Sequence, residues 1–382
     1  MPVYLDHNAT TPMDPQVLEA MLPYLGEHFG NPSSVHRFGR AARAAVERAR
    51  AQVAELVQAH PSQVIFTSGG TEANNLAIKG AAALCAPGLI AVGATEHPSV
   101  AEAAGALRRQ GWRVATIPVD TQGRIGPEVI EATLRQRPAL VCAMLANNET
   151  GVIQDIARLA EAARASGAIL HTDAVQAAGK IEVNFTDSGA QSMSLSAHKI
   201  NGPKGAGALI VEKSVEIEPL LHGGGQEKNR RSGTENVAGI VGFGAAAAAA
   251  RARLAVYGAR MSALRARLES GLDTIGGIEV FAAGAPRLPN TVCFAAAGVD
   301  GEALVLHLDK AGVAVSSGAA CASGTAEPSP VLTAMGVAAE LARGALRASL
   351  GAGNTEEDID IFIRALAAQL PRLRGFARAA SA

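Results

Sequence analysis

Apolar residues follow two different spacings along the chain. Short, mostly apolar runs such as 64–67 and 139–145 have the length of buried strands. Between the runs lie longer stretches in which apolar positions recur every three or four residues, as in a helix with one buried face. The stretch 35–59 has this helical spacing, and Pro61 follows its end. The strands expected in the first part of the chain are 64–67, 89–92, 113–119, 139–145, 168–172, 193–195 and 206–211.

Alternation of strands with helices is typical of an α/β domain built on a parallel sheet. We therefore expect a large domain, residues 14–257, with a mainly parallel seven-stranded sheet flanked by helices. A long helical region, 237–275, bridges to a smaller α+β domain made of residues 1–13 and 258–382. A chain of 382 residues is long enough for two such domains. In the smaller domain we expect strands 277–281, 291–296 and 313–316 and helices 301–311 and 356–370.

Composition narrows the class of protein. With 48% apolar and 18% charged residues the chain can bury a core, and it lacks the composition of disordered proteins. A net charge of −1 and an aromatic content of 3% argue against a nucleic-acid partner. The start has no signal-peptide pattern, and the alanine run 245–250 is followed by arginine, so we expect a cytoplasmic protein without a membrane span. The four cysteines have no C-x-x-C spacing, which fits neither a disulfide framework nor a zinc site.

Polar residues gather where the predicted strands end. After strand 64–67 comes a glycine turn with Gly70 and Thr71 at the start of a helix, an arrangement that favours an anion such as phosphate. Such a turn also occurs as a simple connector. The next strand ends lead to four polar residues that are candidates for one shared crevice: His97, Asn148, Asp173 and Gln176. A lone histidine on such a loop is more often structural.

The stretch 196–205 contains Ser196, His198 and Lys199 after the strand at 193–195. A lysine in a partly desolvated site has a lowered pKa and forms Schiff bases with aldehydes. A surface loop that happens to hold these residues is the alternative. The loop 222–236, which contains Thr234, is too rich in glycine and polar residues to be a simple connector.

Two residues in the C-terminal part add candidate chemistry. Cys321 stands among glycine, alanine and serine in 317–324, which favours a reactive thiol, whereas the other three cysteines lie in apolar runs and are interpreted as core residues. Arg347 lies in an apolar, strand-like segment, and its guanidinium matches the geometry of a carboxylate. An internal salt bridge is the alternative for Arg347.

Together these motifs resemble the cysteine desulfurases of the NifS/IscS type, in the class V aminotransferase group of fold type I pyridoxal-phosphate enzymes. The resemblance covers nearly the whole chain. It departs from the family's usual S-I-R-F-S-L segment, since Ala345 and Ala348 stand near Arg347, and this puts fine substrate positioning in question. The matching segments are 5–12, 67–72, 95–98, 147–151, 173–176, 196–205, 223–237, 316–324 and 346–354.

The resemblance implies a cofactor, pyridoxal 5′-phosphate, and a role for each candidate. Lys199 would bind it covalently and move protons, Asp173 would pair with the ring nitrogen, and His97 would stack on the ring. Gln176 and Asn148 would hydrogen-bond near the ring hydroxyl. Asn148 would also share with Arg347 the binding of the substrate carboxylate. The remaining implied cofactor contacts hold the phosphate: Gly70, Thr71, Ser196, His198 and, from the neighbouring subunit of a homodimer, Thr234.

The resemblance further implies that Arg347 grips the carboxylate of L-cysteine and that Cys321 takes its sulfur as a persulfide, releasing alanine. The sulfur would pass to an acceptor or iron–sulfur scaffold protein, and Cys321 is also a possible transient iron–sulfur ligand by the same analogy. Three alternatives stay open: a selenocysteine lyase, another class V aminotransferase-type enzyme, and a non-catalytic assembly scaffold. An aminotransferase does not need Cys321, so that residue discriminates between the activities.

Overall fold

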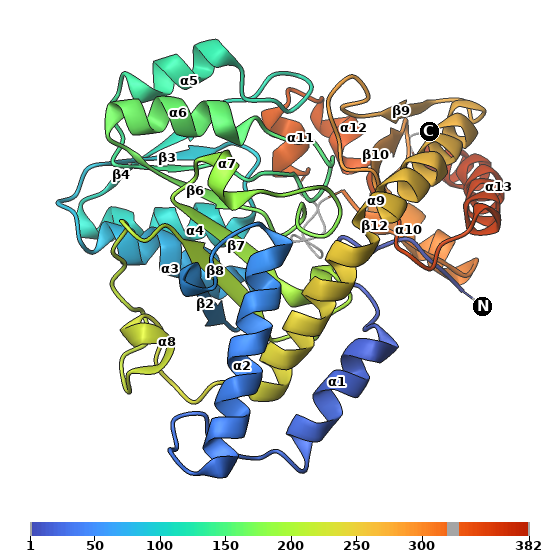
Figure 1. Ribbon diagram of the computed structural model, residues 1–382. Coiled ribbons are helices and arrows are strands. Elements are labelled where there is room, and N and C mark those ends of the chain that lie inside the picture. Colours follow the sequence, from blue (N-terminus) through green and yellow to red (C-terminus); the bar gives the residue numbers. More distant parts are fainter. Residues whose placement is uncertain (1, 319–327, 381–382) are drawn as a thin grey trace.

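A seven-stranded sheet forms the centre of the larger part of the molecule (Figure 1). The structure is a computed structural model that describes residues 2–318 and 328–380. The strand order is β2-β8-β7-β6-β5-β3-β4, and every neighbouring pair is parallel except the two pairs that β8 makes. The expected mainly parallel sheet is confirmed. Its strands are β2 (Val64–Thr67), β3 (Leu89–Gly93), β4 (Arg113–Ile117), β5 (Leu140–Cys142), β6 (Ile169–Asp173), β7 (Ser192–Ser196) and β8 (Gly207–Val211).

Helices cover both faces of this sheet. Helices α3 and α4 pack on the face that carries Ile90 and Val92, whereas α5 and α6 pack on the face of Ala91, because successive strand residues point to opposite sides. The other helices of the first part include α2 and α9, which cover the β2–β8–β7 end. Their bounds are α1 Pro15–Leu25, α2 Arg37–Leu56, α3 Gly70–Ala82, α4 Pro98–Ala106, α5 Pro127–Leu134, α6 Ile156–Ser166, α7 Phe185–Ser188, α8 Gln226–Asn229 and α9 Val237–Asp273.

Helix α9 joins two hydrophobic cores. Phe243 and Ala247 in its first half belong to the core of the large sheet, whereas Met261 and Leu268 in its second half belong to a separate core. The helix is long and apolar enough to cross a membrane, but half of its most apolar stretch is buried inside the protein. A core helix meets the same criterion, and its packing against α1 and α2 accounts for the composition.

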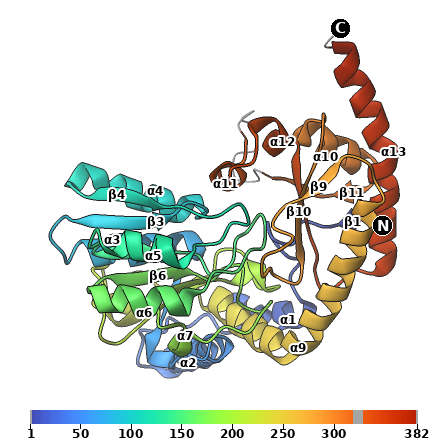
Figure 2. The same ribbon diagram turned by 90° about the horizontal axis from the view of Figure 1, so that it is seen from above.

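The second core lies around a four-stranded antiparallel sheet, β12-β13-β10-β9, and a parallel pair, β1-β11. It includes Val3 and Leu5, so the N-terminal residues pack with the C-terminal part of the chain. In Figure 2 this smaller part lies at the far end of α9, and the last turns of α13 extend away from it. Its elements are β1 Val3–Tyr4, β9 Ile278–Val280, β10 Thr291–Ala296, α10 Gly301–Lys310, β11 Val313–Ala314, β12 Ser316–Ser317, α11 Pro330–Ala334, α12 Ala339–Arg343, β13 Ala345–Ser349 and α13 Glu356–Ala380.

Two sequence-based boundaries in this part are wrong. The single strand expected at 313–316 is two short strands, because Val313 pairs with Val3 whereas Ser316 pairs with Arg347 in a different sheet. The last helix does not end at residue 370 but continues past Pro371 to Ala380. Proline removes one helical hydrogen bond and favours a kink, and here the helix tolerates that loss.

Candidate active site

The polar strand ends converge on one cavity of about 310 Å³. Its walls come from the carboxyl-end loops of the large sheet, from the N-terminal segment and from β13, so it lies between the two cores. Brought together there are ten residues predicted from the sequence: Gly70, Thr71, His97, Asn148, Asp173, Gln176, Ser196, His198, Lys199 and Arg347.

The glycine turn after β2 leads directly into the N-terminus of α3. Gly69 has φ +156°, a conformation that glycine adopts readily, and a Cβ on Gly70 would come within 2.8 Å of Val175. No side chain in the described part of the protein caps this helix, and its first residues, Gly70 and Thr71, line the cavity with the positive end of the helix dipole. A second hollow shares Gly70 and Thr71 with the main cavity and is bordered by Lys204. The turn is therefore suited to an anion such as a phosphate group.

Asp173 lies at the end of β6 with both carboxylate oxygens held. Oδ1 accepts from the Val175 N–H at 2.9 Å, and Oδ2 accepts from Asn74 Nδ2 at 2.7 Å. The side chain is 5% exposed. These two donors fix the position of the carboxylate in the cavity.

Asn74 connects Asp173 to two histidines. Its two N–H groups go to Asp173 and to Ser99 Oγ, at 2.8 Å, so Asn74 Oδ1 must accept from His171 Nε2, at 2.9 Å. Nε2 of His171 therefore carries a proton, and burial lowers the pKa of His171 to about 3, which keeps the ring neutral near pH 7. The sequence analysis missed Asn74, Ser99 and His171. Only the helical position of Asn74, four residues after Gly70 and so on the same face of α3, pointed to it.

His97 caps the N-terminus of α4. Its Nδ1 accepts from the Ser99 N–H at 3.1 Å and lies 2.8 Å from Ser99 Oγ. Burial lowers the pKa of His97, the Lys199 charge lowers it further, and Asp173 partly opposes both effects. With Nδ1 engaged as an acceptor, the neutral ring carries its proton on Nε2.

Lys199 ends the 3₁₀ turn that follows β7. Its Nζ donates to the main-chain oxygens of Asn8 and Ala9, the latter at 2.8 Å, so the N-terminal segment covers it. The neighbouring His198 has a pKa lowered to about 4, first by burial and then by the Lys199 charge. The amine thus lies on the cavity wall and is not a solvated surface charge.

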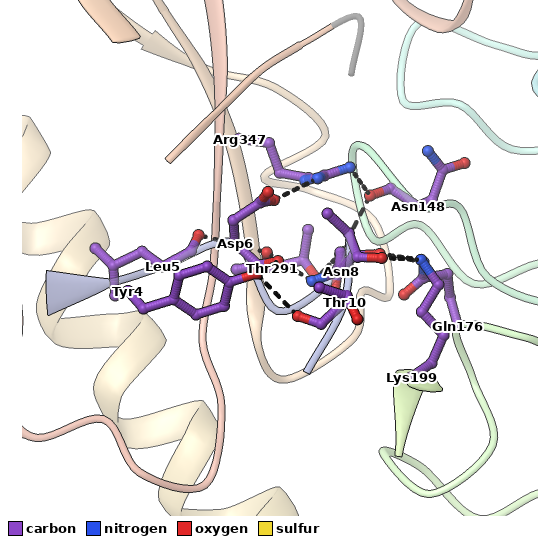
Figure 3. A network of polar contacts seen from close by, with 12 residues as sticks. Tyr4, Leu5, Asp6, Asn8, Thr10, Asn148, Gln176, Lys199, Thr291 and Arg347 are labelled. Atoms are coloured by element: carbon purple, nitrogen blue, oxygen red, sulfur yellow. Dashed lines mark hydrogen bonds and ion pairs between the residues drawn. The ribbon is translucent and has the colours of Figure 1, made fainter. Parts of the chain in front are cut away.

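Arg347 enters from β13, on the side of the smaller sheet (Figure 3). It is 1% exposed, and it donates to Asp6 Oδ1 at 2.6 Å and to the main-chain oxygen of Asn148 at 3.1 Å. The internal salt bridge considered as the alternative is therefore present. Arg347 also lines the cavity, and its contact with a substrate carboxylate stays a prediction. Asp6 was not among the residues predicted from the sequence.

Among the described residues, one predicted site residue, Thr234, is not brought to the cavity. Thr234 is exposed and lines neither of the two hollows described above. Cys321 lies outside the described residues, so its reactive thiol and its role as a transient iron–sulfur ligand both stay predictions. Within residues 2–318 and 328–380, no group of three His, Cys, Asp or Glu side chains could hold a metal ion.

The chain on either side of 319–327 is anchored beside the cavity. Gly318 N donates to the main-chain oxygen of Ala345 at 2.7 Å, two residues from Arg347. A Cβ on Gly318 would lie 2.7 Å from that of Ala345, so these small residues pack directly. On the other side, Ser329 Oγ donates to Glu149, the neighbour of Asn148, at 2.5 Å. The described residues on either side of 319–327 thus bond to sequence neighbours of Arg347 and Asn148, which line the cavity.

The model of the class-V aminotransferase family matches residues 3–362. The chain belongs to this family. It is 44% identical to cysteine desulfurase IscS of Dictyoglomus turgidum over 97% of the chain and 95% of that relative. It is 47% identical to a cysteine desulfurase of Cereibacter sphaeroides over 97% and 96%. Among solved structures, a NifS-like protein has a TM-score of 0.92 at 37% identity, covering 98% of this chain and 100% of the other.

Proposed function

We propose that the protein is a pyridoxal-phosphate-dependent cysteine desulfurase, which transfers sulfur from L-cysteine to Cys321 and releases L-alanine. The observation that carries this is the placement of Lys199, Asp173 and Arg347 on the walls of one cavity. An amine, a fixed carboxylate and a guanidinium are the groups that an aldehyde cofactor with a ring nitrogen and an amino-acid substrate require. The relatives named above are cysteine desulfurases.

The residues present fit pyridoxal phosphate. The uncapped N-terminus of α3, with Gly70 and Thr71, suits the phosphate, and Asp173 suits a protonated ring nitrogen. Lys199 supplies the amine for the aldehyde. When bound, the cofactor supplies an electron sink for bonds at the substrate Cα.

The protein's own groups then perform binding and proton transfer. Arg347 binds the substrate carboxylate, with Asp6 holding the guanidinium in place. The amine of Lys199 takes a proton from the substrate Cα and returns one at a later step. His97, with Nδ1 engaged as an acceptor, presents Nε2–H as a hydrogen-bond donor on the cavity wall, from which it takes part in proton exchange.

Sulfur transfer needs a nucleophile in the segment that starts after Gly318. The Cys321 thiolate attacks the substrate sulfur and forms an S–S bond. The Cβ–S bond breaks, its electron pair remains with the carbon fragment, and protonation of Cβ yields alanine. The products are alanine and a persulfide on Cys321, which a second protein accepts for iron–sulfur assembly or another sulfur pathway. A solved structure of SspA in complex with cysteine, 32% identical with a TM-score of 0.80, supports cysteine as the substrate.

We infer further that the protein is a cytoplasmic homodimer. Apolar side chains are exposed on one face of α1, at Leu18, Leu22 and Leu25, and on the following segment up to α2. Phe29, 76% exposed, stacks on Phe38 there. A contiguous apolar surface of this kind favours an interface, and a second copy would also give the exposed Thr234 a phosphate to bind.

The test compares Cys321→Ser with Cys85→Ser, because Cys85 is exposed in the structure and is not the core residue that the sequence predicted. We expect Cys321→Ser to bind pyridoxal phosphate normally and to release less than one hundredth of the sulfide, while Cys85→Ser retains full turnover. Unchanged turnover in Cys321→Ser would contradict the persulfide mechanism. Wild-type protein that releases selenium from selenocysteine but no sulfur from cysteine would favour a selenocysteine lyase, and protein that binds no pyridoxal phosphate would favour a non-catalytic scaffold.

A further inference from the structure

A second lysine, Lys180, lies buried behind the cavity. It follows β6 on the same loop as Gln176, and it is 3% exposed. Its Nζ donates to Gln176 Oε1 at 2.7 Å and to Asn8 Oδ1 at 2.8 Å. Among the described residues no carboxylate forms an ion pair with it. The proposed function assigns Lys180 no role.

Burying an amine here has a cost that a structural role alone does not explain. An amine without a carboxylate partner loses its hydration, and an unbranched apolar side chain would fill the same space without that loss. Burial and the positive charges of Lys199 and Arg347 lower the pKa of Lys180 well below its ordinary value. The amine donates hydrogen bonds to two side-chain amide oxygens instead. Its role must therefore concern the two residues that carry them, Gln176 and Asn8.

The hydrogen bonds fix the orientation of the Gln176 amide. Its other end lies 2.9 Å from the main-chain oxygen of Asn8, which can only accept, so that end is the nitrogen Nε2. The oxygen Oε1 therefore faces Lys180. One N–H of Nε2 is used on Asn8, and the second has no partner within the described part of the chain, although Gln176 lines the cavity.

Asn8 is held by the same lysine. Its Nδ2 donates to the main-chain oxygen of Asn148 at 3.1 Å and to Thr291 (Figure 3). Its Oδ1 therefore faces Lys180. The main-chain oxygen of Asn8 in turn accepts from both Gln176 and Lys199. Lys180 thus fixes both ends of the contact between Gln176 and the N-terminal segment.

We propose that Lys180 is a positioning residue that holds Gln176 with an amide N–H directed to an oxygen acceptor on the bound ligand. The inference rests on the proposed function: with pyridoxal phosphate the acceptor is the ring oxygen next to the aldehyde. A donor at that oxygen stabilises its ionised form. Without Lys180 the amide loses the contact that holds its oxygen away from the cavity.

The test measures dissociation constants of apo-protein for pyridoxal phosphate and for 3-deoxypyridoxal 5′-phosphate, which lacks the ring oxygen. We expect Lys180→Met to weaken pyridoxal phosphate binding by about tenfold, as for loss of one hydrogen bond, and to leave the deoxy ligand unchanged. Lys213→Met, at an exposed lysine, is the matched control and should change neither. Equal weakening for both ligands, or no weakening for either, would overturn the inference.

Two further variants extend the test, and the first of them keeps it decisive if Lys180→Met folds poorly. Gln176→Glu keeps an oxygen toward Lys180 but has no N–H, so it should lose the same tenfold for pyridoxal phosphate alone. Adding Lys180→Met to Gln176→Ala should weaken binding by no more than about twofold, since the lysine acts through the amide. Additive effects would refute this. Wild-type protein that binds neither ligand would refute the proposed function instead.

Discussion

Breaking the buried ion pair between Arg50 and Glu227 should lower the free energy of unfolding by an amount that can be worked out from the structure. Arg50 NH2 lies 2.7 Å from Glu227 Oε1 and NH1 lies 2.8 Å from Oε2, and the two side chains are 6% and 3% exposed. Glu227 also accepts from the N–H of Phe66 in β2 at 2.8 Å. The pair therefore links the glycine-rich loop before α9 to the strand that carries the anion-binding turn.

Glu227→Gln removes the buried counter-charge of Arg50 and leaves beside it only the exposed carboxylate of Glu47, at 3.2 Å. Removal of one partner of a buried pair costs about 3–5 kcal/mol, whereas an exposed pair is worth about 0–1 kcal/mol. The matched control is Glu55→Gln, which breaks the Arg251–Glu55 pair at 3.0 Å, where the side chains are 59% and 62% exposed. The free energies of unfolding come from urea titration followed by circular dichroism. The same substitution chemistry is thus compared at two extents of burial.

The expected result is a loss of about 3 kcal/mol or more for Glu227→Gln and less than about 1 kcal/mol for Glu55→Gln. Pairing Glu227→Leu with Arg50→Met removes both charges and should recover part of the loss, because no buried charge is then left alone. Equal losses in the two single variants would refute the reasoning from burial.

Three further predictions concern the cavity. Lys199→Ala should bind pyridoxal phosphate but show no visible absorption band from a covalent adduct, and an unchanged spectrum would exclude this lysine. Arg347→Leu should raise the KM for L-cysteine by about tenfold to a hundredfold through loss of a charge-assisted carboxylate contact, while an unchanged KM would assign Arg347 to the Asp6 salt bridge alone. Burial raises the pKa of Glu149 to about 7, so its folded form holds a proton that the unfolded form gives up near pH 4.5. Wild-type stability should therefore fall relative to Glu149→Gln as pH rises from about 5 to 8, and parallel pH curves would contradict this.

The strands and their polar ends could be predicted because both depend on local pattern. Thr291–Ala296 was predicted to the residue, and all seven strands of the large sheet are present. The break after Ala314 could not be predicted, because it depends on which distant strand each residue pairs with. The division into domains at residues 13 and 257 stays a prediction.

The missed residues share a physical reason. Asn8 reaches the cavity, and Asp6 reaches Arg347, only because the N-terminal segment packs with the last strands, through contacts that span nearly the whole chain. His171 and Lys180 are buried behind the residues that line the cavity, and a single buried histidine or lysine in a sequence carries no sign of what it contacts. The sequence pattern thus indicated the residues that line the cavity. The residues that hold them in place could not be predicted, because they depend on tertiary contacts.

The central claim is that Cys321 receives the sulfur of L-cysteine, and peptide mass analysis tests it directly. Protein loaded with pyridoxal phosphate is exposed to one equivalent of L-cysteine, alkylated and digested, and alanine is quantified in the same sample. The account predicts one extra sulfur atom on the peptide that holds Cys321, none on the peptides of Cys85, Cys142 and Cys293, and alanine in equal amount. Alanine formed without added sulfur on Cys321, or the added sulfur on another cysteine, would contradict it.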